Sequence, residues 1–168
     1  MHNVTYEGID PTEHARVLDA GIDHGGNPID AFVDNEGGMP MRCCLADSVA
    51  GDTVAIVAWS PFPWQSAYTE TGPIFIHAAG CPGREATNTL PVEFEGRHIT
   101  LRPYNRDRTI DYDRVRHVPA GGGLLATIDE LLGEDGVEFV HGRNRTGGCY
   151  AFTARSAGSR DARADRPA

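Results

Sequence analysis

Glycine and proline interrupt this chain so often that they limit it to short helices and strands. The sequence has 20 glycines and 11 prolines among its 168 residues, together more than their usual share. Glycine weakens the interior of helices and strands, and proline breaks both. We therefore expect many turns between short elements, and not a helical bundle. Hydrophobic residues make up 40% of the chain, which is enough for one core.

Hydrophobic patterns predict where those short elements lie. The segment from Thr53 to Trp59 is nearly all apolar and β-branched, which is typical of a buried central strand. Asp10 before Pro11 predicts a helix that ends near Asp19, because the carboxylate can cap it and proline suits its first position. Apolar spacing predicts a second helix over 124–132. Further strands are predicted over 4–9, 41–45, 74–77, 92–94, 98–104, 115–118, 137–141 and 149–153.

These elements predict one α+β domain over residues 1–155, with a mixed or mostly antiparallel sheet and two or three short helices packed on one side. We expect 137–141 and 149–153 to pair as a hairpin, and 92–94 to pair with 98–104. Residues 156–168 have no apolar anchor, so we expect them to form a disordered polar tail. The segments 21–38 and 60–71 are expected to be loops.

The charge of the chain excludes some classes of partner. A formal charge of −9 argues against general nucleic-acid binding. All basic residues are arginine, so Schiff-base catalysis through lysine is excluded. No apolar run is long enough to span a membrane, and the first residues do not have the pattern of a signal peptide. We therefore expect a cytoplasmic protein with reduced cysteines and with neither a nucleic-acid nor a membrane partner.

Several short motifs, taken in order, resemble a known family. They are Pro40-Met41-Arg42, Leu45, Asp47, Gly51, Ser66-Ala67-Tyr68, the GPIFI segment 72–76, Leu101-Arg102-Pro103-Tyr104, Arg143-Asn144 and Gly148-Cys149-Tyr150. Their order and spacing are similar to the uncharacterised bacterial family catalogued as domain of unknown function 1203, over roughly residues 3–155. The resemblance implies a compact single domain and brings no established activity. Family members often have cysteine before the arginine of the first motif, where this chain has Met41, followed by Cys43 and Cys44.

Three residues are candidates for catalysis in an enzyme of small-molecule metabolism, either biosynthetic or detoxifying. His77 and His141 carry imidazoles, which titrate near neutral pH as a general acid or base must. Cys149 follows two glycines, and its thiol together with His141 and Asn144 provides the residue types of a thiol hydrolase. The alternative is that Gly147-Gly148 only forms a turn and Cys149 packs inside.

Arginines and aromatic residues are candidates for binding a polar or anionic substrate, because guanidinium groups hold carboxylates and phosphates through paired hydrogen bonds. The candidate binding residues are Arg42, Arg102, Tyr104, Arg143, Asn144, Trp64 and Tyr68. Pairing with acidic residues such as Asp47, Asp52 and Asp107 is the alternative for the arginines. The aromatic loop is expected either to plug one end of a sheet or to close over a ligand.

Cysteine and histidine also allow a metal site, although their spacing matches no common ligand pattern. His77 and Cys81 are four residues apart, and Cys149 with Cys43 or Cys44 would complete the four ligands that zinc prefers. No CxxC or HxxxH pair occurs, so the sequence assigns no metal ligand and identifies no cofactor. Buried or free thiols are the alternative, with Cys44 and Cys149 in the core. Besides an enzyme, the sequence leaves open a non-catalytic ligand-binding or interaction module and a zinc-stabilised structural domain, and it does not determine the oligomeric state.

Overall fold

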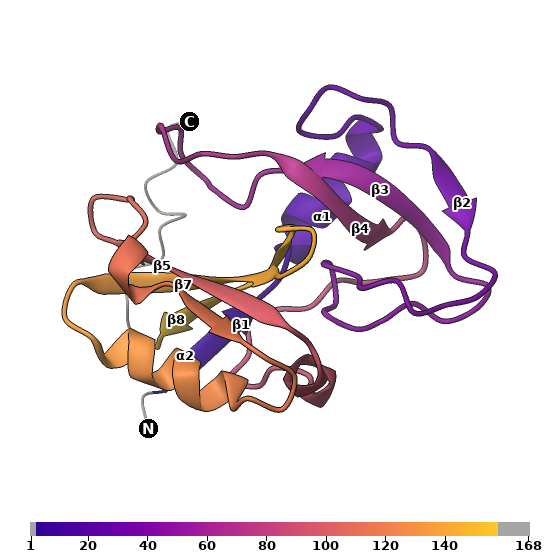
Figure 1. Ribbon diagram of the computed structural model, residues 1–168. Coiled ribbons are helices and arrows are strands. Elements are labelled where there is room, and N and C mark those ends of the chain that lie inside the picture. The colour runs from indigo at the N-terminus through magenta and orange to yellow at the C-terminus, as the bar shows by residue number, and fades with distance from the viewer. Residues whose placement is uncertain (1–2, 158–168) are drawn as a thin grey trace. The chain divides into compact units, whose positions relative to one another are not determined.

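The computed structural model describes residues 3–157, which form two sheets, two α-helices and two 3-10 helices (Figure 1). The first sheet has the order β1 (Val4–Glu7), β8 (Tyr150–Ser156), β7 (Val137–Asn144), β5 (Ile99–Asn105) and β6 (Arg116–Val118). The second has the order β2 (Ala31–Val33), β3 (Thr53–Trp59) and β4 (Gly72–His77). The pairs β5–β6, β5–β7, β7–β8, β2–β3 and β3–β4 are antiparallel. The predicted α+β class with mostly antiparallel strands and two short α-helices is therefore confirmed.

The chain divides into two compact units. Among the described residues, the five-stranded unit comprises residues 3–6, 62–69 and 87–157, and the three-stranded unit comprises residues 7–61 and 70–86. The expectation of one domain over residues 1–155 stays a prediction. The predicted tail lies outside the described residues from position 158 on, and its first residue, Ser156, ends β8. None of the helices within residues 3–157 has the length and apolar character needed to cross a membrane.

The five-stranded unit is built around α2 (Leu124–Gly133), which packs on β7, β5 and β8 (Figure 1). Four of its apolar side chains are buried, namely Leu124, Ile128, Leu131 and Leu132. The carboxylate of Glu95 accepts the backbone N–H groups of Leu124 and Leu125, both at 3.1 Å. A negative charge is favourable at the N-terminus of a helix. Glu95, which is distant in the sequence, therefore caps the N-terminus of α2.

The three-stranded unit confirms two of the predicted elements. The helix α1 (Pro11–Ala20) begins after Asp10, whose side chain accepts the N–H groups of Thr12 at 3.0 Å and Glu13 at 3.2 Å. It ends at Gly21, whose φ of 66° is a left-handed conformation that glycine adopts without strain. The segment Thr53–Trp59 is strand β3, the central strand of its sheet, and most of its side chains are buried.

Three predicted elements are wrong, each because contacts between distant residues override the local pattern. Residues 92–94 belong to a 3-10 helix, η1 (Val92–Gly96), that buries Phe94, while β5 pairs with β6 and β7. Residues 41–45 form a turn, in which Leu45 has a φ of 63°. The predicted loop 21–38 contains the short edge strand β2, which pairs with β3.

The contact between Gly142 and Phe152 generates a test of this packing. The two residues face each other across β7 and β8, and a Cβ atom on Gly142 would lie 2.3 Å from the Phe152 ring. Because neither strand can move away from its neighbours, we expect Gly142→Ala to lower the free energy of unfolding by about 1–3 kcal/mol, measured by urea denaturation. Gly96→Ala, which meets nothing within 4 Å, is the matched control. Equal midpoints for the two variants would contradict the packing of Phe152 over Gly142.

Candidate metal centre

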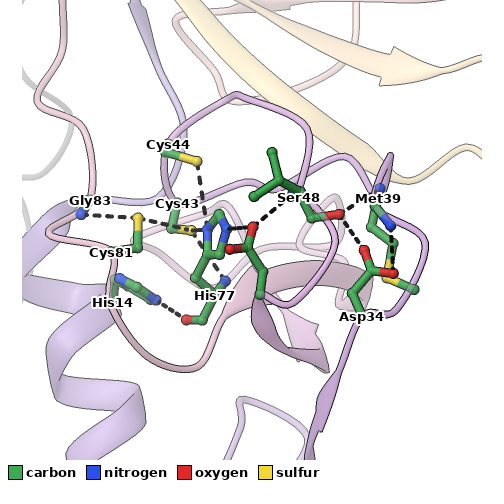
Figure 2. A network of polar contacts seen from close by, with 12 residues as sticks. His14, Asp34, Met39, Cys43, Cys44, Ser48, His77, Cys81 and Gly83 are labelled. Atoms are coloured by element: carbon green, nitrogen blue, oxygen red, sulfur yellow. Dashed lines mark hydrogen bonds and ion pairs between the residues drawn. The ribbon is translucent and has the colours of Figure 1, made fainter.

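Three cysteines and one histidine lie close together in the three-stranded unit. Cys43, Cys44, His77 and Cys81 each offer one ligand atom, and these four atoms all lie within 4.8 Å of one another. Figure 2 shows the three sulfur atoms around the imidazole ring of His77. We call these four residues the Cys3His cluster.

Backbone contacts bring the two parts of the Cys3His cluster together. His77 is the last residue of β4, and Cys81 follows in the loop after it. The N–H of Arg42 donates to the carbonyl of Phe75 at 2.9 Å, which holds the cysteine-bearing turn beside the end of β4. The turn itself is closed by a hydrogen bond of 2.9 Å from the N–H of Met41 to the carbonyl of Ala46.

The distances within the cluster fit a single tetrahedral ion. Nδ1 of His77 lies 3.4 Å from Sγ of Cys43 and 3.7 Å from Sγ of Cys44, and the Sγ atoms of Cys43 and Cys81 are 3.8 Å apart. Ordinary zinc–sulfur and zinc–nitrogen bonds in a tetrahedron separate two sulfurs by about 3.8 Å and a sulfur from a nitrogen by about 3.6 Å. These three distances are close to the spacing that zinc requires, and all other pairs of the four ligand atoms lie within 4.8 Å.

The ionised thiolate is the form that binds metal, and the surroundings favour it at Cys44, whereas burial raises the pKa of Cys81. The backbone N–H of His77 donates to Sγ of Cys43, and that of Gly83 donates to Sγ of Cys81, both at 3.4 Å. A hydrogen bond from Cys43 lowers the pKa of Cys44, and the same bond raises the pKa of Cys43. The cluster therefore holds one thiol that ionises readily next to two sulfurs that receive backbone donors.

Asp52 and His14 fix the position of His77 within the cluster. Nε2 of His77 donates to Oδ2 of Asp52 at 3.1 Å, which turns Nδ1 toward the sulfurs. The N–H of Val49 also donates to Asp52, at 2.8 Å, and these two hydrogen bonds hold the pKa of the Asp52 carboxyl below its ordinary value. From α1, Nε2 of the buried His14 donates to the carbonyl of His77 at 2.8 Å (Figure 2).

The sequence pointed to part of this cluster and missed the rest. It considered Cys149 together with one of the adjacent cysteines, whereas both Cys43 and Cys44 belong to the cluster and Cys149 does not. Cys149 lies in the turn between β7 and β8 of the five-stranded unit, where its thiol donates to the carbonyl of Gly147 at 3.7 Å. All four cysteines are free thiols; Cys43 is buried, and Cys44 and Cys149 are only partly buried.

Asp52 also differs from the expectation based on sequence. The sequence analysis named it as an alternative partner for the candidate arginines, and its carboxylate contacts His77 and the N–H of Val49. An aspartate just before a β-strand has no spacing that relates it to a histidine 25 residues later. The antiparallel pairing of Val54 with His77 in β3 and β4 is what brings the two side chains together.

Several other candidate residues gather on one face of the five-stranded sheet. Arg102 of β5 lies opposite His141 of β7, and Arg143 donates to Nδ1 of His141 at 3.5 Å. His141 is only 1% exposed. Its imidazole is surrounded by four aromatic rings whose centroids lie within 5.4 Å of its own, those of Phe62, Tyr104, Phe139 and Tyr150. The predicted hairpin of 137–141 with 149–153 is confirmed, and His141 pairs with Thr153 within it.

The remaining candidates have local partners. Asn144 accepts the N–H groups of Thr146 and Gly147 in the turn after β7. Trp64 is buried beside Phe139, with the guanidinium of Arg108 4.5 Å from the centre of one of its rings.

The last two predicted binding residues lie in different units. Tyr68, in the five-stranded unit, lies beside Tyr112, with their ring centroids 6.5 Å apart. Arg42 is in the three-stranded unit, where its buried side chain donates to the carbonyl of Pro40 at 2.9 Å. The structure therefore gives each of these two side chains a contact within its own unit.

Comparison with known proteins identifies a family and no individual relative. The sequence model of a family described as a protein of unknown function, DUF1203, matches residues 38–155, which is more than half of the chain. No curated protein and no solved structure matches the chain. The matched range includes all four residues of the Cys3His cluster.

The buried imidazole of His141 generates a prediction about pH. Burial, and then the positive charges of Arg143, Arg155 and Arg102, lower the pKa of His141 well below its ordinary value. In the unfolded chain this histidine takes up a proton near pH 6.5, while in the folded protein it stays neutral, so stability is lost as the pH falls below that value. We expect the contribution of His141 to reach about 1.4 kcal/mol per pH unit in urea denaturation between about pH 5 and 6.5.

Two variants isolate this contribution. His141→Gln should flatten the dependence of unfolding free energy on pH, because the titrating group is gone. His117→Gln, at an exposed position of the same unit, should leave the dependence as it is in the parent protein. If both variants lost stability in acid as steeply as the parent, His141 would not be the neutral buried group described above.

Proposed function

Since the chain belongs to the DUF1203 family, whose description assigns no function, we propose from its own residues that it is a zinc-binding protein. The ion is held by Cys43, Cys44, His77 and Cys81. The observation that carries this proposal is that their four ligand atoms lie within 4.8 Å of one another, in two segments that are far apart in the sequence.

The types of ligand and their spacing favour zinc over other ions. Thiolate and imidazole in a tetrahedral set suit zinc, whereas calcium and magnesium prefer oxygen ligands. An iron–sulfur cluster distributes its ligands over two or more iron atoms, and so spreads them more widely than a single ion does. The short distances from Nδ1 of His77 to Sγ of Cys43 and Cys44 therefore support one ion.

The number of ligands supports a structural role for the ion. Four protein ligands fill a tetrahedral site, whereas a catalytic zinc keeps one position for water or substrate. Cys43 and His77 are 34 residues apart, so the ion links the turn after Met41 to the end of β4. We infer that zinc stabilises the three-stranded unit, as binding energy at a structural site becomes folding energy. The proposal keeps the expected cytoplasmic location, because a reducing compartment preserves the three thiols.

An enzyme of small-molecule metabolism is the alternative function, and the proposed zinc site removes one of its candidate residues. His77 would bind the ion through Nδ1 and donate to Asp52 through Nε2, so neither nitrogen is left to transfer a proton to a substrate. The remaining candidates for proton transfer and nucleophilic attack, His141 and Cys149, stay predictions.

Metal analysis tests the proposal directly. Protein purified without a histidine tag, or reconstituted with zinc after chelation, is expected to contain about one zinc per chain. Cys43→Ser and Cys81→Ser should lose the metal and unfold at lower temperature, because each removes a ligand. Cys149→Ser is the matched control and should keep the metal, since Cys149 is not in the cluster. Parent protein that binds no zinc after reconstitution would refute the proposal. Bound iron together with absorbance of visible light would also refute it, because the site would then hold an iron–sulfur cluster.

The contact between Asp52 and His77 generates a second test. Removing the carboxylate that orients a ligating histidine weakens metal binding by about 10- to 100-fold, and we expect Asp52→Asn to show a loss of this size. Competition with a coloured chelator measures the affinity. Asp30→Asn, at an exposed position of the same unit, should bind zinc as tightly as the parent protein does. Equal affinities for both variants would show that Asp52 does not support the site.

A further inference from the structure

The three thiols of the Cys3His cluster differ in how far solvent reaches them. Cys43 is 0% exposed, whereas Cys44 and Cys81 are only partly buried. An oxidant dissolved in water can therefore contact Cys44 or Cys81, while Cys43 is shielded from it. Exposure decides which cysteine of a group is oxidised first. The cluster thus places accessible sulfur atoms next to a protected one.

Distance selects the pair of sulfur atoms that can form a disulfide. Sγ of Cys81 lies 3.8 Å from Sγ of Cys43. Cys43 and Cys44 are neighbours in the chain, and adjacent α-carbons are about 3.8 Å apart, which is less than the about 4.4 Å that a disulfide ordinarily spans. Cys43 is therefore suited to pair with Cys81 and not with Cys44.

The loop that carries Cys81 leaves room for this pairing. Residues 78–86 contain neither helix nor strand, so Cys81 can shift without separating a strand from its sheet. The N–H that donates to Sγ of Cys81 comes from Gly83, which belongs to the same loop and moves with it. A disulfide brings its two sulfur atoms to about 2.05 Å, so Cys81 has to approach Cys43 by less than about 2 Å.

We propose that the Cys3His cluster is a peroxide-sensitive zinc site, in which oxidation joins Cys81 to Cys43 and releases the ion. This inference rests on the proposed function, since it concerns the regulation of the same site. Thiols that coordinate a metal ion are deprotonated, and the thiolate is the form that peroxides oxidise. After oxidation only Cys44 and His77 remain as ligands, which is half of the set that a structural zinc site needs.

The reaction takes two electrons from two thiolates and gives them to one peroxide. The Cys81 thiolate attacks one oxygen of hydrogen peroxide, so that an S–O bond forms, the O–O bond breaks and hydroxide leaves; Cys81 becomes a sulfenic acid. The Cys43 thiolate then attacks the sulfur of Cys81, forms the S–S bond and expels a second hydroxide. The two hydroxides replace the two thiolate charges that the zinc ion loses.

The disulfide connects the same two segments that the ion connects. It holds the turn that carries Cys43 beside the loop after β4, where Cys44 and His77 also lie. Reduction by a thiol then returns both sulfur atoms to the neighbourhood of the other two ligands. Release of the ion is therefore reversible.

Treatment of the zinc-loaded full chain with hydrogen peroxide tests the proposal, after metal analysis has verified the loading. A coloured zinc chelator should record about one zinc released per peroxide consumed, and peptide mass spectrometry should find a disulfide between Cys43 and Cys81. Dithiothreitol and added zinc should restore the metal content. Cys149→Ser should release zinc at the same rate as the parent protein, because Cys149 belongs to the other unit.

Cys81→His separates the disulfide from oxidation of the cluster in general. Zinc is also bound by two cysteines with two histidines, so this variant has four ligands but no sulfur at position 81. It should keep its zinc at peroxide concentrations that empty the parent protein. If the variant does not take up zinc, the disulfide mapped in the parent protein still decides.

Three results would overturn the proposal. They are retention of zinc by the peroxide-treated parent protein, a released chain without a disulfide between Cys43 and Cys81, and loss of zinc from loaded Cys81→His as readily as from the parent protein. Each of them leaves the zinc-binding function intact. Failure of that function is recognised separately, because the parent protein would then contain no zinc before peroxide is added.

Discussion

A single backbone hydrogen bond, from the N–H of Arg42 to the carbonyl of Phe75, underlies the candidate metal centre. It joins a turn without regular structure to a strand that is itself held by β3. The adjacent cysteines then lie beside the ring of His77, and the N–H of His77 donates to Cys43. Because the Leu45 backbone takes a left-handed conformation, the turn closes directly after its cysteines. The geometry of the Cys3His cluster thus follows from backbone pairing.

The sequence predicted those elements whose signals are local. Asp10 and Pro11 start α1 as expected, and the apolar segment Thr53–Trp59 is a central strand. Prediction from the sequence failed where contacts with residues distant in the chain determine the local structure. Residues 92–94 have the composition of a short strand, yet burial of Phe94 against Phe152 and capping of α2 by Glu95 make this segment a 3-10 helix.

The candidate site was likewise predictable only in part from local signals in the sequence. Residue type alone singled out His77 and Cys81, and their separation of four residues at the end of a strand was a usable signal. Which cysteines would join them depended on the contact between the turn after Met41 and β4, which no local pattern encodes. Cys149 has the same side chain and a conspicuous Gly-Gly neighbour, yet it belongs to the other unit. On the sheet, the predicted strand ended at residue 141, whereas β7 continues to Asn144, so the sequence placed Arg143 in the following turn and not in the strand that carries His141.

The separation of Cys43 from His77 has a consequence for the unfolded chain. An ion that joins them closes a loop of 34 residues, which contains all of β3 and nearly all of β4. Closing a loop of this size removes conformational entropy from the unfolded state, worth about 4 kcal/mol by the relation used for disulfides. The proposed zinc cross-link would stabilise the three-stranded unit as a disulfide does, without oxidation of the cysteines. Loss of the ion would remove this restriction from the unfolded chain and lower the stability of the three-stranded unit.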